Sequence, residues 1–363
     1  MAHIAIDARI INSSTGRYVD RLITYLQDID TINQYSILVR AKDVDFWKPR
    51  NANFTVRVAE FDNYSFAEQI GFKTFLNKLK PDLVHFCMPQ QPISYKGKKV
   101  TTFHDLTLLK TYNSDKNWLV FHAKQKIGKY VFKKVTETSN HIITISEFTK
   151  NELQSYFPVP DEKITTIYEA SDVSNIAPKK YQLPFKKYIL YVGQQSDYKN
   201  IKRLGDAHQI LLAKHPNLGL VLVGKKNQSA LNNEKYFNDR NYKNILFTDF
   251  VDDQNLSWLY SNAQAYIFPS LMEGFGLPGL EAMGYGTPVV SSNATCLPEI
   301  YEQAAHYFTP TDTSDMAEAI DQVLTDDKIR TRLAKAGFKQ IKKYSWKKQA
   351  QETHKVYLDI LEK

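Results

Sequence analysis

Short apolar runs alternate along the chain with longer stretches in which apolar residues recur at helical spacing. In the first half, the runs that predict buried strands are 4–6, 37–39, 83–86, 100–103 and 142–145. No two-residue hairpin turn joins successive runs, so we expect parallel strands linked by crossover helices on both faces of a sheet. This alternation predicts an α/β fold.

The same pattern restarts after residues 172–186, where proline, lysine and polar residues replace periodic apolar ones. The second series of runs is 188–192, 220–223, 245–247, 265–268 and 289–291. Because 363 residues exceed what one hydrophobic core usually supports, we expect two doubly wound domains, 1–172 and 187–344. A long amphipathic helix is predicted at 345–363, with its apolar positions at Trp346, Ala350, Val356, Tyr357 and Ile360.

Composition adds an expectation about the compartment. Hydrophobic residues make up 43% of the chain, and no run approaches the roughly 18 apolar residues of a membrane span. The first residues, MAHIAIDARI, resemble a strand and not the basic and apolar regions of an export signal. We therefore expect a cytoplasmic protein, or one that also associates peripherally with the inner face of a membrane.

Candidate metal ligands are few. The cysteines, Cys87 and Cys296, lie in different halves of the chain without metal-ligand spacing, so we expect two buried thiols. Two D-x-D strings, at 28–30 and 43–45, resemble a metal-binding motif, but they follow an early helix and an early strand, and we interpret them as solvated turn acids. The sequence predicts no metal and no cofactor.

The net charge of +8 is concentrated in residues 1–180, which carry 25 lysines and arginines against 19 acidic residues. Within it, 116–135 contains six lysines and no acidic residue, interleaved with aromatic side chains. This run predicts either a domain helix with aromatics in the core and solvated lysines, or a helix that docks on anionic lipid. Nucleic acid is not an expected partner, because no recognised nucleic-acid module accompanies the charge.

The most informative segment is PSLMEGFGLPGLE, at 269–281, in which a glycine-broken turn stands between Glu273 and Glu281. Glycine lets the backbone of the turn approach a ligand closely. The turn, made by Gly274, Phe275 and Gly276, opens a helix at Leu277, where unpaired N–H groups attract phosphate. The segment predicts an anion site.

Paired carboxylates also occur in glycosidases, where they work across roughly 5 to 9 Å. Here the spacing argues against that chemistry, because eight helical residues span about 12 Å. We expect Glu273 to belong to the turn and face a sugar, and Glu281 to accept hydrogen bonds from ribose hydroxyls. Together they indicate a sugar-nucleotide site.

The segment EGFGLPGLE resembles the E-x(7)-E signature of the retaining glycosyltransferases of family 4. The resemblance covers nearly the whole chain, through STGRYV around Gly16, FHDL around His104, ISEF around Ser146, YVGQQSDYKN around Lys199 and GTPVVSSNATCLPEI after the signature. It implies the GT-B fold, two Rossmann-like domains that face a cleft, with the helix at 345–363 packed back on the first domain.

The resemblance also implies residue roles. Glu281 would hold the ribose and Glu273 the transferred sugar, while Lys199 and the amides of 274–277 would hold the diphosphate. His104, as a neutral imidazole, would donate to or accept from a sugar hydroxyl. The loop at Gly16 would reach the donor diphosphate or the acceptor. Ser146, by contrast, is expected to cap the helix 147–156.

This chain departs from the family near Lys199. An arginine that often accompanies the lysine is replaced by Gln194 and Tyr198, and Arg203, one helical turn beyond Lys199, is the candidate that compensates. The departure leaves the strength of phosphate binding open.

These observations predict a retaining, metal-independent transferase that moves a sugar from a nucleotide diphosphate to a hydroxyl of a glycan or lipid-linked acceptor in cell-surface polysaccharide synthesis. The sequence pattern YVG…KN resembles that of mannosyltransferases. This resemblance implies GDP-mannose as the donor. Two alternatives stay open: an epimerase or sugar phosphorylase on the same architecture, and a donor-binding or membrane-docked partner protein without turnover.

Overall fold

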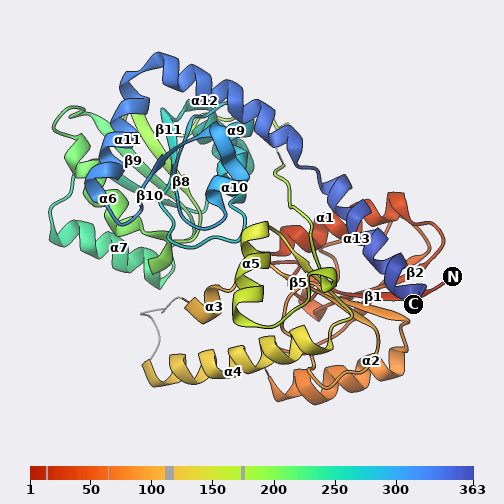
Figure 1. The fold of residues 1–363 in the computed structure, drawn as a ribbon. Coiled ribbons are helices and arrows are strands. Elements are labelled where there is room, and N and C mark those ends of the chain that lie inside the picture. The colour runs from red at the N-terminus through yellow and green to blue at the C-terminus, as the bar shows by residue number, and fades with distance from the viewer. Residues whose placement is uncertain (14, 64, 111–117, 173–175) are drawn as a thin grey trace. The chain divides into compact units, whose positions relative to one another are not determined.

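The computed structural model describes residues 1–363 except 14, 64, 111–117 and 173–175, and the chain forms two compact units (Figure 1). The first unit comprises Met1–Leu109, His122–Glu169 and Ser345–Lys363, and the second comprises Lys110–Phe121 and Ala170–Tyr344. Residues 172–186, where the apolar pattern is interrupted, contain neither helix nor strand among those that the structure describes.

The first unit is built on a parallel sheet in the order β3-β2-β1-β4-β5-β6-β7. Its strands are β1 (His3–Asp7), β2 (Gln34–Val39), β3 (Phe54–Val58), β4 (Leu83–Phe86), β5 (Lys99–Phe103), β6 (His141–Thr144) and β7 (Ile164–Thr166). Its helices are α1 (Gly16–Ile29), η1 (Ala41–Asp43), η2 (Glu68–Phe72), α2 (Lys73–Leu79), α3 (Thr107–Lys110), α4 (Trp118–Thr138), α5 (Glu147–Tyr156), η3 (Asp161–Lys163) and α13 (Trp346–Leu361).

The second unit repeats the plan with a parallel sheet in the order β10-β9-β8-β11-β12-β13. Its strands are β8 (Lys187–Val192), β9 (Leu218–Val223), β10 (Ile245–Asp249), β11 (Ala265–Phe268), β12 (Val289–Ser292) and β13 (Ala305–Phe308). Its helices are η4 (Asp197–Lys199), α6 (Ile201–Leu211), α7 (Gln228–Asp239), α8 (Asp253–Asn262), α9 (Leu277–Gly284), α10 (Leu297–Tyr301), η5 (Glu302–Ala304), α11 (Thr313–Thr325), α12 (Asp327–Gln340) and η6 (Ile341–Lys343).

Every predicted strand forms and the strands pair in parallel, so the α/β prediction is confirmed. The predictions missed β3, β7 and β13, which all lie at sheet edges. An edge strand is half exposed and need not carry a continuous apolar run: β3 has one buried residue, Phe54, and β7 has only Ile164.

Helix α13 packs against α1 within the first unit, through the predicted apolar face. Polar contacts add to this packing. His354 Nε2 lies 2.9 Å from Asp30 Oδ2 at the end of α1, and Tyr357 hydrogen-bonds His85 on β4. Residues more than 250 positions apart thus complete one core.

The prediction of solvated acids at the D-x-D strings is wrong for two of them. Asp30 is 3% exposed and accepts hydrogen bonds from Tyr35 and Asn33, and Asp43 is equally buried and accepts from Asn12. These buried donors need an acceptor: backbone N–H groups, an amide and a hydroxyl at Asp30, and the Asn12 amide at Asp43. Asp28 is exposed and pairs with Arg50, as predicted for a surface acid.

The basic run at 116–135 lies mostly on α4, although 111–117 and the side chains of 118–124 fall outside the described residues. In the remainder, Phe132 is buried edge-on against Phe103, whereas Tyr130 is 54% exposed and Lys126 and Lys129 are exposed. One aromatic therefore faces the core as the domain-helix alternative requires, and docking on lipid stays a prediction. No helix among the described residues is long and apolar enough to cross a membrane.

Candidate active site

The carboxyl edge of the second sheet carries Lys199, which ends the short helix η4 after β8. Asn200 follows in the left-handed conformation (φ 62°) and immediately precedes α6. Its side-chain amide donates to the carbonyls of Pro269 and Pro310, so this turn is fastened to the loop after β11. These two hydrogen bonds fix the backbone position from which the Lys199 side chain extends.

Lys199 and Glu273 form an ion pair at this edge. Lys199 Nζ lies 2.6 Å from Glu273 Oε1, and their side chains are 15% and 12% exposed. Burial alone acts to lower the pKa of Lys199, but the charge of Glu273 outweighs it and raises that pKa above the ordinary lysine value. The lysine is therefore a fixed positive charge. It also lies near the rings of Tyr198 and Phe268, at 5.1 and 5.7 Å from their centroids.

Glu273 is held through its backbone by the loop after β12. Its N–H donates to Thr295 Oγ1 at 3.2 Å, and its carbonyl accepts from the thiol of Cys296 at 3.3 Å. Cys296 is a buried free thiol, as predicted, and so is Cys87. This support could not be predicted from the sequence, because Thr295 adopts a left-handed conformation (φ 58°) that its residue type does not favour.

The turn before α9 has the predicted geometry. Gly276 adopts φ 100°, and a Cβ there would lie 2.5 Å from the hydroxyl of Tyr301, which donates to the Gly276 carbonyl. Glycine is therefore required at this position. The α9 helix begins at Leu277, also as predicted, and ends at Gly284. Gly274 and Phe275 are buried, and the Phe275 ring packs edge-on against Tyr344 at 5.5 Å, which anchors the turn.

Glu281 lies on α9, one turn before its end. Its Oε2 accepts a hydrogen bond of 3.1 Å from the hydroxyl of Tyr260, whose ring stacks on Tyr285. Burial above all raises the pKa of Tyr266, and the charges of Glu281 and Glu273 add to the effect. Both glutamates thus lie around one buried phenol at this edge.

Arg203, the residue predicted to compensate for the missing arginine, lies in the first turn of α6. Its guanidinium donates to Asn200 Oδ1 at 2.9 Å, and it lines a cavity of about 360 Å³ with Asp206 and Tyr236. That cavity is not lined by Lys199 or Glu273. Arg203 therefore supports the Asn200 turn, and its compensating role at the phosphate stays a prediction.

Two buried polar side chains at the same edge have unsatisfied groups. Gln195, after β8, has no hydrogen-bond partner for either side-chain amide atom among the described residues, and neither has the hydroxyl of Ser270 after β11. Both residues are at most 1% exposed. Buried polar groups without a hydrogen-bond partner are rare in native structures. These two side chains are therefore candidates for contact with a bound ligand.

His104 lies in the first unit, at the carboxyl end of β5. Its Nε2 lies 2.9 Å from the carbonyl oxygen of Cys87, and its Nδ1 lies 3.2 Å from Glu169 Oε1. Burial acts to lower the pKa of His104, but the hydrogen bond and charge of Glu169 outweigh it, and the pKa is raised. Both ring nitrogens thus face acceptors within the first unit, which favours the protonated ring over the neutral imidazole expected, and the contact of His104 with a sugar stays a prediction. Glu169 was not predicted, because it follows the missed strand β7.

Gly16 starts α1 two residues before Tyr18, whose ring packs edge-on against His104 at 4.8 Å. The start of α1 and His104 are thus connected through Tyr18. A Cβ at Gly16 would lie 1.9 Å from the carbonyl oxygen of Ile11, so a close backbone approach accounts for this glycine. Ser146 caps α5 as predicted, since its hydroxyl accepts from the Thr149 N–H.

Metal ligands do not cluster in the part of the chain that the structure describes, which contains no group of three or more His, Cys, Asp or Glu side chains suited to a cation. At the edge of the second sheet, Lys199 is paired with Glu273, and Glu281 lies near the same buried phenol, Tyr266, as Glu273 does.

Two family models match the chain: Glycosyltransferase Family 4 over residues 16–175, and Glycosyl transferases group 1 over residues 173–340. The chain is 32% identical to O-antigen chain mannosyltransferase B of Escherichia coli over 274 residues, which cover 72% of this chain and 70% of that protein. It is 27% identical to the serotype-specific mannosyltransferase WbdA of Escherichia coli, but spans only 44% of that relative's length.

Solved structures share the fold over the full length. Sucrose-phosphate synthase of Thermosynechococcus elongatus matches with a TM-score of 0.80 at 19% identity, covering 99% of both chains. WaaG, a glycosyltransferase involved in lipopolysaccharide biosynthesis, matches with a TM-score of 0.69 at 13% identity, covering 98% of this chain and 99% of that one. The fold is GT-B, as the resemblance implied. The chain belongs to glycosyltransferase family 4.

Proposed function

We propose that this glycosyltransferase moves mannose from GDP-mannose to a hydroxyl of a glycan or lipid-linked acceptor in cell-surface polysaccharide synthesis, with retention of anomeric configuration and without a metal. The support for mannose and for this class of acceptor comes from the relatives, among which O-antigen chain mannosyltransferase B covers most of the chain. O-antigen chain mannosyltransferase RfbU of Salmonella typhimurium, 28% identical over 243 residues, adds to it.

The observation that carries the proposal is the Lys199–Glu273 ion pair beside the start of α9. Lys199 and the amides of 274–277 would bind the diphosphate, since a buried cation and a helix start both favour phosphate. Glu281 would bind the ribose and Glu273 the mannose. His104 of the first unit would contact the mannose, and Gly16 would shape a loop near the phosphates or the acceptor.

In the proposed reaction, the bond between the sugar C1 and the donor phosphate oxygen breaks, and the acceptor oxygen bonds to C1 on the same face. The acceptor proton passes to the departing phosphate, so no protein nucleophile is needed. Negative charge grows on that phosphate as an oxocarbenium-like sugar forms. Preorganised positive groups such as Lys199 lower the barrier, because their position costs nothing at the moment of reaction.

The first test measures thermal stabilisation by UDP, GDP, ADP and their sugar conjugates. A ligand at 100 times its dissociation constant stabilises the folded protein by roughly 2.7 kcal/mol. We expect GDP and GDP-mannose to stabilise the native chain and to lose that effect in Glu281→Ala. Glu318→Ala, an exposed glutamate of α11, is the matched control and should respond as the native chain does.

Transfer itself is tested with GDP-mannose and a panel of glycan and lipid-linked acceptors, reading the anomeric configuration of the product by NMR. An α-linked product from the α-linked donor supports retention. Release or rearrangement of the sugar without acceptor would support the phosphorylase or epimerase alternative. Nucleotide binding without turnover on any acceptor would support the partner-protein alternative.

A further inference from the structure

The strongest concentration of charge lies at residues 328–348, which contain nine lysines or arginines and no aspartate or glutamate. Since the whole chain carries +8, the rest of the chain is slightly negative. Residues 181–363 carry a net charge of only +2, because acidic residues elsewhere in this half offset the nine cations of 328–348. The segment forms α12 and η6 in the second unit and continues into α13.

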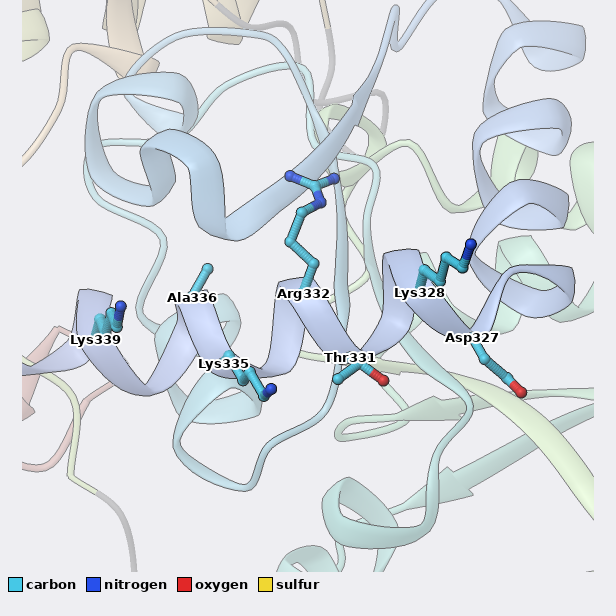
Figure 2. A pocket seen from close by; sticks show the side chains of 7 residues that line it. All are labelled: Asp327, Lys328, Thr331, Arg332, Lys335, Ala336 and Lys339. Carbon is cyan, nitrogen blue, oxygen red and sulfur yellow. The ribbon is translucent and has the colours of Figure 1, made fainter.

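Four of these cations lie along one face of α12: Lys328, Arg332, Lys335 and Lys339, here called the α12 stripe. Their spacing of four, three and four residues keeps them on one side of the helix over about 16 Å. Figure 2 shows Lys328, Arg332 and Lys339 extending towards one edge of this face and Lys335 towards the other, with the small residues Thr331 and Ala336 between them. All four cations are exposed.

The α12 stripe is not neutralised within the described residues. Its four side chains form no ion pair there, although neighbouring cations do: Arg330 pairs with Asp327, and Lys343 with Glu302. The acid at the end of the stripe, Asp327, is thus already engaged. In Figure 1, α12 runs along the outer edge of the second unit. Four like charges in a row repel one another, and this repulsion is unfavourable for the folded chain. An anionic partner would relieve it.

We propose that the α12 stripe docks the second unit on a bilayer that contains anionic lipids. The shape of the face favours a bilayer over a single small anion, because the cations are spread along a convex helix and do not converge on one point. An aromatic side chain next to them favours lipid over a soluble polyanion: Phe338, on the flank between Lys335 and Lys339, is 45% exposed. Basic helices with an aromatic flank bind at the headgroup boundary.

The size of the effect follows from the number of cations. Each lysine or arginine near an anionic bilayer strengthens partitioning about fivefold, so four together give several hundredfold. Salt should weaken the binding, because exposed charges are screened within a Debye length of about 8 Å at physiological ionic strength.

The test is co-sedimentation of the full chain with vesicles of phosphatidylcholine, alone or mixed with an equal part of phosphatidylglycerol. We expect binding to the mixed vesicles only, and its loss in Lys328→Ala/Arg332→Ala/Lys335→Ala/Lys339→Ala. The matched control, Lys42→Ala/Lys78→Ala/Lys225→Ala/Lys243→Ala, removes four exposed lysines elsewhere and the same net charge, and should still bind. Because the changed side chains are exposed, both variants should keep the native unfolding midpoint.

Two further variants distinguish other sources of binding. Lys126→Ala/Lys129→Ala/Lys133→Ala tests α4 and should retain binding, and Phe338→Ser should weaken vesicle binding severalfold without changing retention on immobilised heparin. Equal loss in the control variant would reduce the effect to net charge and overturn the proposal. Loss in the α4 variant alone would move the docking surface there. Retention on heparin through the α12 stripe without vesicle binding would assign the stripe to a soluble polyanion.

Discussion

Lys199 and Glu273 lie 74 positions apart in the chain, yet Lys199 Nζ and Glu273 Oε1 are 2.6 Å apart at the carboxyl edge of the second sheet. The pair joins two residues for which the sequence suggested separate ligands. A buried lysine needs a counter-ion, because desolvation of an unpaired charge costs several kcal/mol. Glu273 thus keeps Lys199 charged and in place before any donor binds.

Removal of one partner should therefore cost more than removal of both. Glu273→Gln and Lys199→Met should each lower the free energy of unfolding by about 3 kcal/mol, because each leaves a buried charge uncompensated. The double variant should regain most of that loss while staying inactive. Urea unfolding of the four proteins measures the cycle. Additive losses in the double variant would show that the two charges do not stabilise each other.

The His104–Glu169 pair should make stability depend on pH. Because the folded-state pKa of His104 is raised above the ordinary 6.5, its stabilisation is fully present below that pH and is lost as the pH rises through the folded value. Glu169→Gln should then cost about 1.5 to 3 kcal/mol near pH 6, the range for a hydrogen bond to a charged group, and less at higher pH. Unfolding free energies across this range provide the measurement.

Glu318→Gln, on the exposed face of α11, controls for the loss of a carboxylate. An NMR titration of the His104 ring gives a second readout, and its pKa should fall in Glu169→Gln. If Glu169→Gln costs the same at every pH, the pair is a neutral hydrogen bond and not an ion pair.

Asp30 should contribute to acid stability. Burial acts to raise its pKa, but hydrogen bonds from Tyr35 and Asn33 outweigh this and lower it from 3.8 to about 2. The stabilisation is present above pH 3.8 and is lost as the pH falls towards 2, which amounts to about 2 kcal/mol. Acid unfolding should lose this dependence in Asp30→Asn. Asp28→Asn, two residues earlier and exposed, should unfold as the native chain does.

Gly276→Ala should destabilise the second unit by about 1 to 3 kcal/mol and abolish donor binding, because alanine disfavours φ 100° and its Cβ would meet the Tyr301 hydroxyl. Combining it with Tyr301→Phe relieves the contact but not the backbone strain, so only part of the stability should return. Thermal unfolding with and without nucleotide measures both effects. Full recovery in the double variant would assign the whole cost to the contact.

The sequence predicted the sheets well because central parallel strands are continuous apolar runs, which need no tertiary information to recognise. Edge strands such as β7 lack that signal, and missing β7 hid Glu169, the partner of His104. The burial of Asp30 was equally invisible, since His354, one of its partners, lies 324 positions away. The family resemblance assigned Lys199 and Glu273 to one donor site, but only side-chain packing brings their charges together.

The packing of α13 on α1 also bears on how the protein folds as it is made. Residues 345–363 belong to the first unit, yet the ribosome reaches them only after the whole second unit. At synthesis rates of roughly 5 to 20 residues per second, the segment after Glu169 takes on the order of 10 to 35 s to reach Ser345. During that interval, α13 does not yet cover its face of α1. The nascent chain therefore needs a chaperone, or another form of protection, to keep this face from misfolding.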